Sequence, residues 1–287
     1  MSAELPVSAI HPQAPEFLSV AALYRAPIDV EAALARMKEL WNEPVSPVWE
    51  EVPAGSPGTG TEAGRLLRFS IDGVLVMMTP ISGSLEVQRG HLPDHTFYIA
   101  VTTYSPVREQ DLAEAAHRTG SVNGVKPGDV PPADALPLAR RRRMVSAHIV
   151  LTEVLDVLMR EEAAVGVYRS ELGVVQPPEM VTELADSLTR GQAPVPLWVS
   201  VRLVHPDLVY GRTLGLALFG HLDLEVVESM KSEEEVYAML ANTADYIVSS
   251  DFYLLPGQTV GYREGEELQI TEATSPTDGT AVLRIQF

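Results

Sequence analysis

Two histidines in the first third of the chain have a spacing that suits a metal ion. His91 and His95 are four residues apart, which would bring both imidazoles to one face of a helix. Pro93 and Asp94 lie between them and a strand-like run follows, which disfavours a helix. Because no third ligand lies nearby in the sequence, we interpret the two histidines as polar residues at the entrance to a strand, and we expect neither a metal nor another cofactor.

A further histidine stands beside a carboxylate in a predicted turn, His205-Pro206-Asp207. Such a pair can act as a general base and the group that orients it. No serine in a G-x-S-x-G elbow accompanies the pair to serve as nucleophile. The alternative, which we favour, is that Asp207 supplies the hydrogen bonds of the turn.

Three carboxylates, Asp223, Glu225 and Glu228, follow one another along a predicted strand and are expected to project from one face. Paired carboxylates can bind a divalent cation or carry out acid–base chemistry. A strand with one face in solvent produces the same pattern. We favour that interpretation, because apolar residues supply the opposite side: Leu222, Leu224, Val226 and Val227.

One basic cluster, Arg140, Arg141, Arg142 and Arg143, interrupts an otherwise acidic chain. Such a cluster can bind phosphate or RNA. We predict that it begins a helix, where four cations oppose the helix dipole. No aromatic stacking platform accompanies it, so we favour pairing with an acidic surface of this chain or of a partner. Trp198 is a further candidate for partner binding, with a core or rim position as the alternative.

Composition limits the classes of function. The chain has 287 residues, no cysteine and a formal net charge of −18. It therefore has no disulfide, thiolate metal site or cysteine nucleophile, and its acidic field disfavours nucleic acid and anionic membranes. The N-terminus lacks the pattern of a signal peptide and no apolar run reaches the length of a membrane span, so we expect a cytoplasmic protein.

Apolar periodicity predicts an α+β fold with antiparallel sheets covered on one face by helices. After an irregular segment, 1–16, an N-terminal half spans 17–118 and contains a strand at 17–25, a helix capped by Asp29, a hairpin at Asp72-Gly73 and a strand at 96–104. A Pro-rich insertion follows at 119–139.

The C-terminal half, 140–287, resembles the first in its order of elements, and we expect the halves to form one compact unit. It is predicted to contain a helix with an apolar stripe from Leu151 to Leu158, then a buried strand and a further helix that begins at Pro177-Pro178-Glu179. Strands are expected at 196–204, 212–219 and 222–227, a helix after the capping box Ser232-x-x-Glu235, and short strands near 259–262, 266–271 and 281–286.

Four segments resemble one known family. They are GVYRSELGVVQPPEM (166–180), PLWVSVRL (196–203), GRTLGLALFGHLDLE (211–225) and PGQTVGY (256–262). In these segments and their spacing the chain is similar to DUF4261, a bacterial family of unknown function, from about Phe17 to Thr271. The matching residues are mostly glycine, proline and apolar, which identify a fold and not a reaction, so the resemblance implies no catalytic residues.

These observations predict a protein without a catalytic centre that works by recognising another protein, as immunity proteins and chaperones do. An acidic surface beside exposed strand edges suits a basic or edge-complementary partner. The alternative is a hydrolase or a small-ligand-binding enzyme with a site between the halves that uses His205, Asp207 or the Asp223–Glu225 pair. Convergence of those polar groups in a pocket would favour the enzyme.

Overall fold

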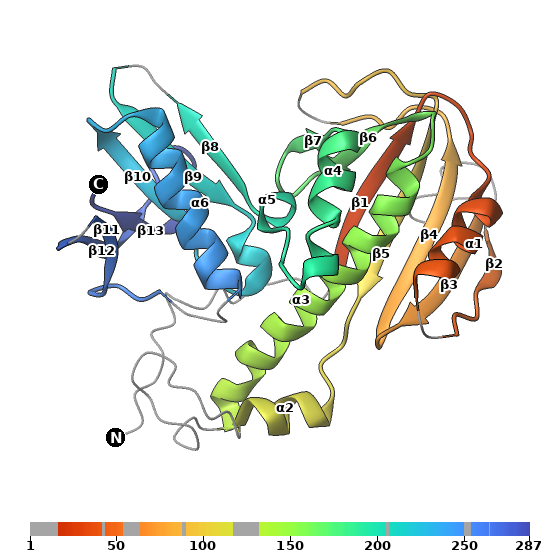
Figure 1. The fold of residues 1–287 in the computed structure, drawn as a ribbon, viewed down its shortest axis with the longest axis horizontal. Coiled ribbons are helices and arrows are strands. Elements are labelled where there is room, and N and C mark those ends of the chain that lie inside the picture. Colours follow the sequence, from red (N-terminus) through yellow and green to blue (C-terminus); the bar gives the residue numbers. More distant parts are fainter. Residues whose placement is uncertain are drawn as a thin grey trace. The chain divides into compact units, whose positions relative to one another are not determined.

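The computed structural model describes residues 17–41, 44–53, 64–87, 90–116, 132–204, 207–249, 254–263 and 265–287. They form two compact units (Figure 1). One unit contains the described residues within Glu16–Pro106 and Ser146–Leu197, and the other those within Val107–Val145 and Trp198–Phe287. Each predicted half therefore contributes residues to both units. The predicted α+β class is confirmed, because each unit is built on its own sheet with helices.

The sheet of the first unit is antiparallel throughout. Its strand order is β2 (Val48–Val52), β3 (Gly64–Ile71), β4 (Val74–Ser82), β5 (Phe97–Tyr104), β1 (Phe17–Tyr24), β6 (Ala164–Arg169) and β7 (Val174–Gln176). Alternate residues of β5 are buried, starting with Phe97. Its helices are α1 (Val30–Leu40), α4 (Pro178–Ala185) and the C-terminal part of α3 (Pro132–Met159), with a 3-10 turn η2 (Leu188–Arg190).

Several local predictions for this unit are confirmed. Asp29 precedes α1, and its carboxylate accepts a hydrogen bond of 3.0 Å from the Ala32 amide. Asp72 and Gly73 join β3 to β4 with φ angles of 50° and 73°, as a type I′ turn requires. These features depend only on residues that are close in the sequence.

The sheet of the second unit is mixed, because β10 and β13 run parallel while the other neighbours are antiparallel. Its order is β11 (Thr259–Arg263), β12 (Glu266–Thr274), β13 (Ala281–Ile285), β10 (Leu224–Ser229), β9 (Val209–Leu214) and β8 (Ser200–Val204). Helix α6 (Glu233–Ser249) packs on β8, β9 and β10. A Cβ atom on Gly211 of β9 would lie 2.7 Å from Val236 and 2.8 Å from Leu240, so glycine permits this close packing.

Three predictions about the second half of the chain are wrong. The predicted strand 196–204 begins instead with a helical turn, α5 (Val195–Trp198), since proline is accepted in a first helical turn. The predicted strand 212–219 ends at Leu214, because Gly215 adopts a φ of 119° and a 3-10 helix, η3 (Leu216–Phe219), follows. Helix α3 starts at Pro132, inside the predicted insertion, so the arginine run does not lie at a helix start.

A short helix, α2 (Glu109–Ala116), belongs to the second unit. Its Ala115 packs with Leu138 and Ala139 of α3 in a small buried cluster. Among the described residues, no helix combines the length and apolar composition that a membrane crossing requires.

Candidate functional site

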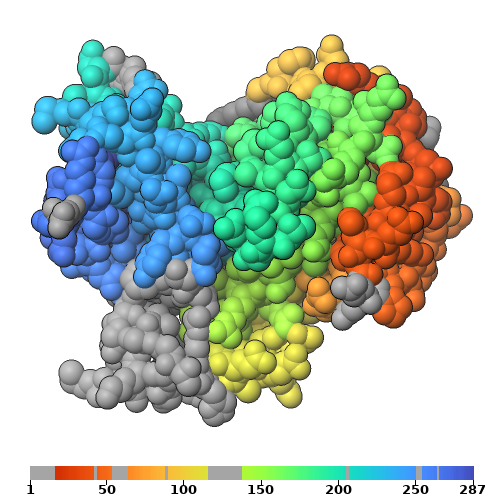
Figure 2. Space-filling view, in the orientation of Figure 1, coloured from red at the N-terminus to blue at the C-terminus, as the bar shows by residue number. Residues whose placement is uncertain are grey.

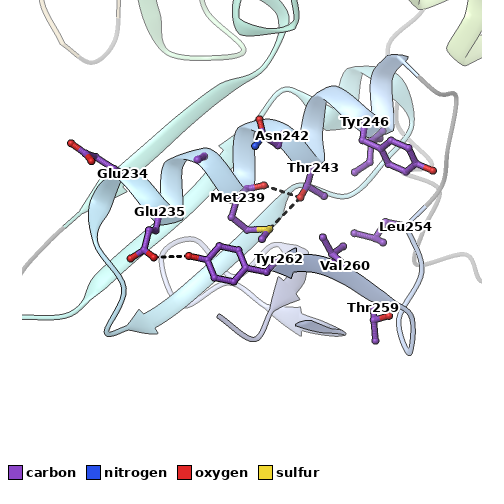
Figure 3. A pocket seen from close by; sticks show the side chains of 13 residues that line it. Glu234, Glu235, Met239, Asn242, Thr243, Tyr246, Leu254, Thr259, Val260 and Tyr262 are labelled. Atoms are coloured by element: carbon purple, nitrogen blue, oxygen red, sulfur yellow. Dashed lines mark hydrogen bonds between the residues drawn. The ribbon is translucent and has the colours of Figure 1, made fainter. Parts of the chain in front are cut away.

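A groove of about 630 Å³ lies between helix α6 and strand β11 in the second unit (Figure 3). The outer face of α6 lies at the molecular surface in Figure 2. The helix wall includes Glu234, Glu235, Met239, Asn242, Thr243, Tyr246 and Ile247. The opposite wall consists of Leu254, Thr259, Val260, Gly261 and Tyr262.

One end of the groove is closed by a side-chain bridge between its two walls. The Tyr262 hydroxyl donates a hydrogen bond of 2.5 Å to Glu235, and Arg263 pairs with the same carboxylate oxygen at 2.6 Å. The other oxygen of Glu235 accepts from the Ser232 amide, which confirms the predicted capping box. The bond from Tyr262 is the main cause that lowers the pKa of Glu235 below its ordinary value.

The interior of the groove is mainly apolar. Met239, Ile247 and Leu254 lie buried behind its lining, and the accessible apolar surface comes from Val260 and Tyr246. The hydroxyl of Thr243 donates to the Met239 carbonyl at 2.7 Å, one turn earlier in the helix, so it is already engaged (Figure 3). This lining suits the burial of apolar side chains of a partner and offers no activated nucleophile among the described groove residues.

Strand β11 is an edge strand of its sheet, and among the described strands it pairs only with β12. The N–H of Ile270 in β12 donates to the Gln258 carbonyl, and its C=O accepts from the Gly257 amide. The main-chain groups of Ile270 therefore point toward the β11 side. By alternation Leu268 also faces β11, and its partner is Val260. The neighbours Thr259 and Gly261 therefore direct their main-chain groups to the open edge, beside the groove.

Glu225 is one of the three carboxylates considered for cation binding or acid–base chemistry. It is fully buried, so the prediction of a solvent-facing strand is wrong at this residue. Its carboxylate accepts hydrogen bonds from Tyr210 at 2.5 Å, Ser275 at 2.7 Å and Arg284 at 2.8 Å. Register explains the third bond, because Arg284 of β13 lies beside Glu225 of β10. The carboxylate thus has its hydrogen bonds satisfied inside the protein and holds the end of β12 against β9 and β10.

Asp223 lies near the same network but has a different environment. It accepts hydrogen bonds of 3.2 Å from the Leu216 amide and from Thr213, and Arg212 lies 4.0 Å away. Burial raises the pKa of Asp223 to about 6, although the charge of Arg212 acts in the opposite direction. Arg212 itself is held by Asp278 at 2.9 Å and by Thr280 at 2.9 Å.

The prediction that Glu228 projects from the same face as Asp223 and Glu225 is wrong. The pairing of β10 with β9 shifts between Val226 and Ser229, and Glu228 adopts a φ of 53° at this irregularity. Glu228 lines another hollow of about 630 Å³, together with Asp207, Arg202 and Tyr210. Asp207 is exposed there, while His205 lies outside the described residues.

The two histidines considered for a metal line the same hollow. The His95 ring lies 2.7 Å from the Leu85 amide through Nε2 and 2.7 Å from the Pro93 carbonyl through Nδ1. Both ring nitrogens of His95 are therefore occupied by main chain, and the residue fixes the loop that precedes β5. His91 lies four residues earlier in the same loop.

The arginine run is largely internal to the second unit. Arg143 forms a two-bond ion pair with Asp111 of α2, and the longer bond, from Nε, measures 2.7 Å. Arg141 is buried and donates to the Ile247 carbonyl in the last turn of α6 at 2.5 Å. Arg140 is exposed and Arg142 is half-buried. Trp198 is fully buried, with its ring 6.1 Å from that of Phe219, so it is not presented to a partner.

The helix and the strand that form the groove were predicted from the sequence, but none of the residues that line the groove was predicted to form a binding site. The strand at Thr259 and the helix after Ser232 were both predicted. Their pairing across a groove was not, because it depends on how β12 and β13 place β11 beside α6. The available signal was the sequence of α6 itself, in which Tyr246 is an aromatic residue outside the apolar stripe.

Comparison with known proteins identifies one family. Residues 212–286 match the model of DUF4261, a domain of unknown function. The match confirms the resemblance over this segment and includes β10, α6 and β11 to β13, and hence both walls of the groove. No curated protein and no solved structure matches the chain.

Proposed function

Because residues 212–286 match the model of the DUF4261 family, whose function is unknown, we propose a function from the groove itself. In this proposal the protein is a recognition module that binds an extended segment of a partner protein. The segment adds to the open edge of β11 as an extra strand and places alternate side chains in the groove against α6.

The observation that carries the proposal is the coincidence of an open strand edge with an apolar groove. Main-chain groups of Thr259 and Gly261 point to the edge, and the same residues line the groove. An extended peptide that joins a sheet edge gains main-chain hydrogen bonds, and adjoining pockets select its side chains. Open edges are usually protected in proteins that do not use them.

The environments of Asp223 and Glu225, the carboxylates considered for catalysis, support a binding function more than a catalytic one. Glu225 is fully buried and satisfied by three donors, and Asp223 is held by Thr213 and the Leu216 amide. These groups stabilise the sheet that carries the groove. In our proposal they give the edge strand a rigid support.

Substitution of Gly261 tests the proposal directly. Proline at this position removes the outward N–H, and the bonds from Val260 to β12 remain, because proline is accepted at edge positions. Peptides selected from a random displayed library on the full chain should bind Gly261→Pro at least about tenfold more weakly, a loss of about 1.4 kcal/mol. Gly261→Ala, whose Cβ would meet no heavy atom within 4 Å, is the matched control because it keeps the N–H.

Two controls complete this test. Urea unfolding should show that the proline variant is folded, and the alanine variant should retain most of the affinity. Equal affinity of the selected peptides for all three proteins would show that the β11 edge is not the binding site.

A further inference from the structure

Resting on that proposed function, we infer the chemistry of the partner segment. The groove selects a cationic, extended segment in which a lysine or arginine lies beside Glu234 and apolar side chains follow at every second residue.

The helix wall provides the charge selection. Helix α6 carries four acidic side chains, Glu233, Glu234, Glu235 and Asp245, and no lysine or arginine. The carboxylate of Glu235 is occupied by Tyr262, Arg263 and the Ser232 amide. Glu234 is exposed at the same end of the groove, with its carboxylate directed outward from α6 and not toward Tyr262, so it is accessible to an arriving cation (Figure 3).

The basic residues near this end are already engaged with the protein. Arg263 pairs with Glu235 at 2.6 Å, and Lys231 lies over the rings of Tyr262 and Phe287 at 5.0 Å and 5.4 Å. The chain as a whole carries a net charge of −18, which attracts a cationic segment over a longer range. Charge complementarity therefore favours a basic occupant over an acidic one.

The spacing of the apolar positions follows from strand geometry. Five residues of β11 extend over roughly 13 Å, and a strand added beside them presents every second side chain to the groove. Beyond Glu234 those side chains meet the half-buried Val260 and then the exposed ring of Tyr246. A basic residue followed by two alternating apolar residues matches this order of surfaces.

A second copy of the chain is a poorer occupant. Pairing of two β11 edges would bring together two chains that each carry a net charge of −18. Repulsion between two such charges opposes this association. A basic segment of a different protein avoids this repulsion.

The test uses three synthetic peptides with the ¹⁵N-labelled full chain. All three peptides are N-acetylated and C-amidated: Lys-Thr-Val-Thr-Leu-Thr has the inferred pattern, Glu-Thr-Val-Thr-Leu-Thr reverses the charge, and Lys-Val-Leu-Thr-Thr-Thr breaks the alternation with the same composition. Dissociation constants come from the shifts of the Val260 and Gly261 amide signals. The first peptide should bind at least about tenfold more tightly than either of the others, and high salt should reduce its advantage over the acidic peptide.

Reversing the charge of Glu234 tests whether this residue selects the cationic peptide. Glu234→Lys should weaken the basic peptide about tenfold and strengthen the acidic one. Glu272→Lys on β12 is the matched control, because it makes the same change in net charge at an exposed residue outside the groove. Equal effects of the two substitutions would overturn the inference, because only the overall charge would then matter.

Two further outcomes separate this inference from the proposed function. If peptides bind without charge preference and Gly261→Pro abolishes their binding, strand addition stands and the cationic selection is wrong. If Gly261→Pro leaves every affinity unchanged, the proposed function fails as well. Concentration-dependent dimerisation that Gly261→Pro abolishes would make a second copy the occupant and overturn the inference.

Discussion

The hydroxyl of Tyr262 donates a 2.5 Å hydrogen bond to Glu235 and thereby joins the edge strand β11 to helix α6. Glu235 also completes the capping box at the start of α6 by accepting from the Ser232 amide. One carboxylate therefore serves both the start of the helix and the closed end of the groove. The position of β11 and the N-terminus of α6 are coupled through this residue.

We predict that Tyr262→Phe raises the pKa of Glu235 toward its ordinary value, because the bond from Tyr262 is the main cause of the lowering. An NMR titration of the Glu235 side-chain carboxyl carbon measures this change. Tyr237→Phe is the control, because Tyr237 is an exposed tyrosine on the same helix. An unchanged Glu235 titration in Tyr262→Phe would show that the bond does not persist in solution.

The features that were predictable from the sequence depend on short-range interactions. Asp29 caps α1 three residues before its bonded amide, Asp72 and Gly73 supply the turn dihedrals themselves, and Ser232 and Glu235 cap α6 reciprocally. In each case the residue types alone determine the local conformation. The positions of most helices and strands, and hence the α+β class, followed from such signals together with apolar periodicity.

The features that were not predictable depend on residues far apart in the sequence. Glu225 looks like a solvent-facing carboxylate, yet Arg284, 59 residues later, and Tyr210 satisfy it inside the protein. Similarly, the groove exists because β12 and β13 place β11 beside α6. A single sequence contains no local signal for either arrangement, since the pairing of strands is decided by the complete sheet.

We predict that Gly211→Ala destabilises the protein by about 1–3 kcal/mol, the usual cost of overpacking. The new methyl group would lie 2.7 Å from Val236, 2.8 Å from Leu240 and 3.0 Å from Leu203, so α6 must move from its sheet. Urea unfolding measures the difference. Gly261→Ala, with no heavy atom within 4 Å of the new carbon, should change stability by less than about 0.5 kcal/mol. Equal effects would contradict the packing argument.

The buried ion pair between Arg143 of α3 and Asp111 of α2 should contribute to the stability of the second unit. Both side chains are about nine-tenths buried, so Asp111→Ala leaves a buried guanidinium without its carboxylate. We expect a loss of about 3 kcal/mol in the free energy of unfolding. The exposed pair of Glu50 with Arg68 is the control, and Glu50→Ala should cost less than about 1 kcal/mol. Similar losses in the two variants would refute a special role for burial.

Asp223 and His221 lie two residues apart and have opposite effects on the pH dependence of stability. Burial lowers the pKa of His221 to about 4, so the unfolded chain binds its proton more readily and stability is lost as the pH falls from 6.5 toward 4. Burial raises the pKa of Asp223 to about 6, so the folded protein retains this proton more strongly and stability is lost as the pH rises from 4 toward 6. Each shift corresponds to roughly 3 kcal/mol, so the two effects largely cancel in the natural chain.

Asp223→Asn should therefore uncover the effect of His221. The asparagine oxygen can still accept from the Leu216 amide and from Thr213, so the local structure is retained. The unfolding free energy of the variant should rise between pH 4 and 6.5, and relative to the natural chain the variant should gain up to about 3 kcal/mol over the same interval. Urea unfolding of both proteins across this range measures the difference, in which the other titrating groups cancel. A constant difference at every pH would mean that the Asp223 carboxyl titrates alike in the folded and unfolded protein.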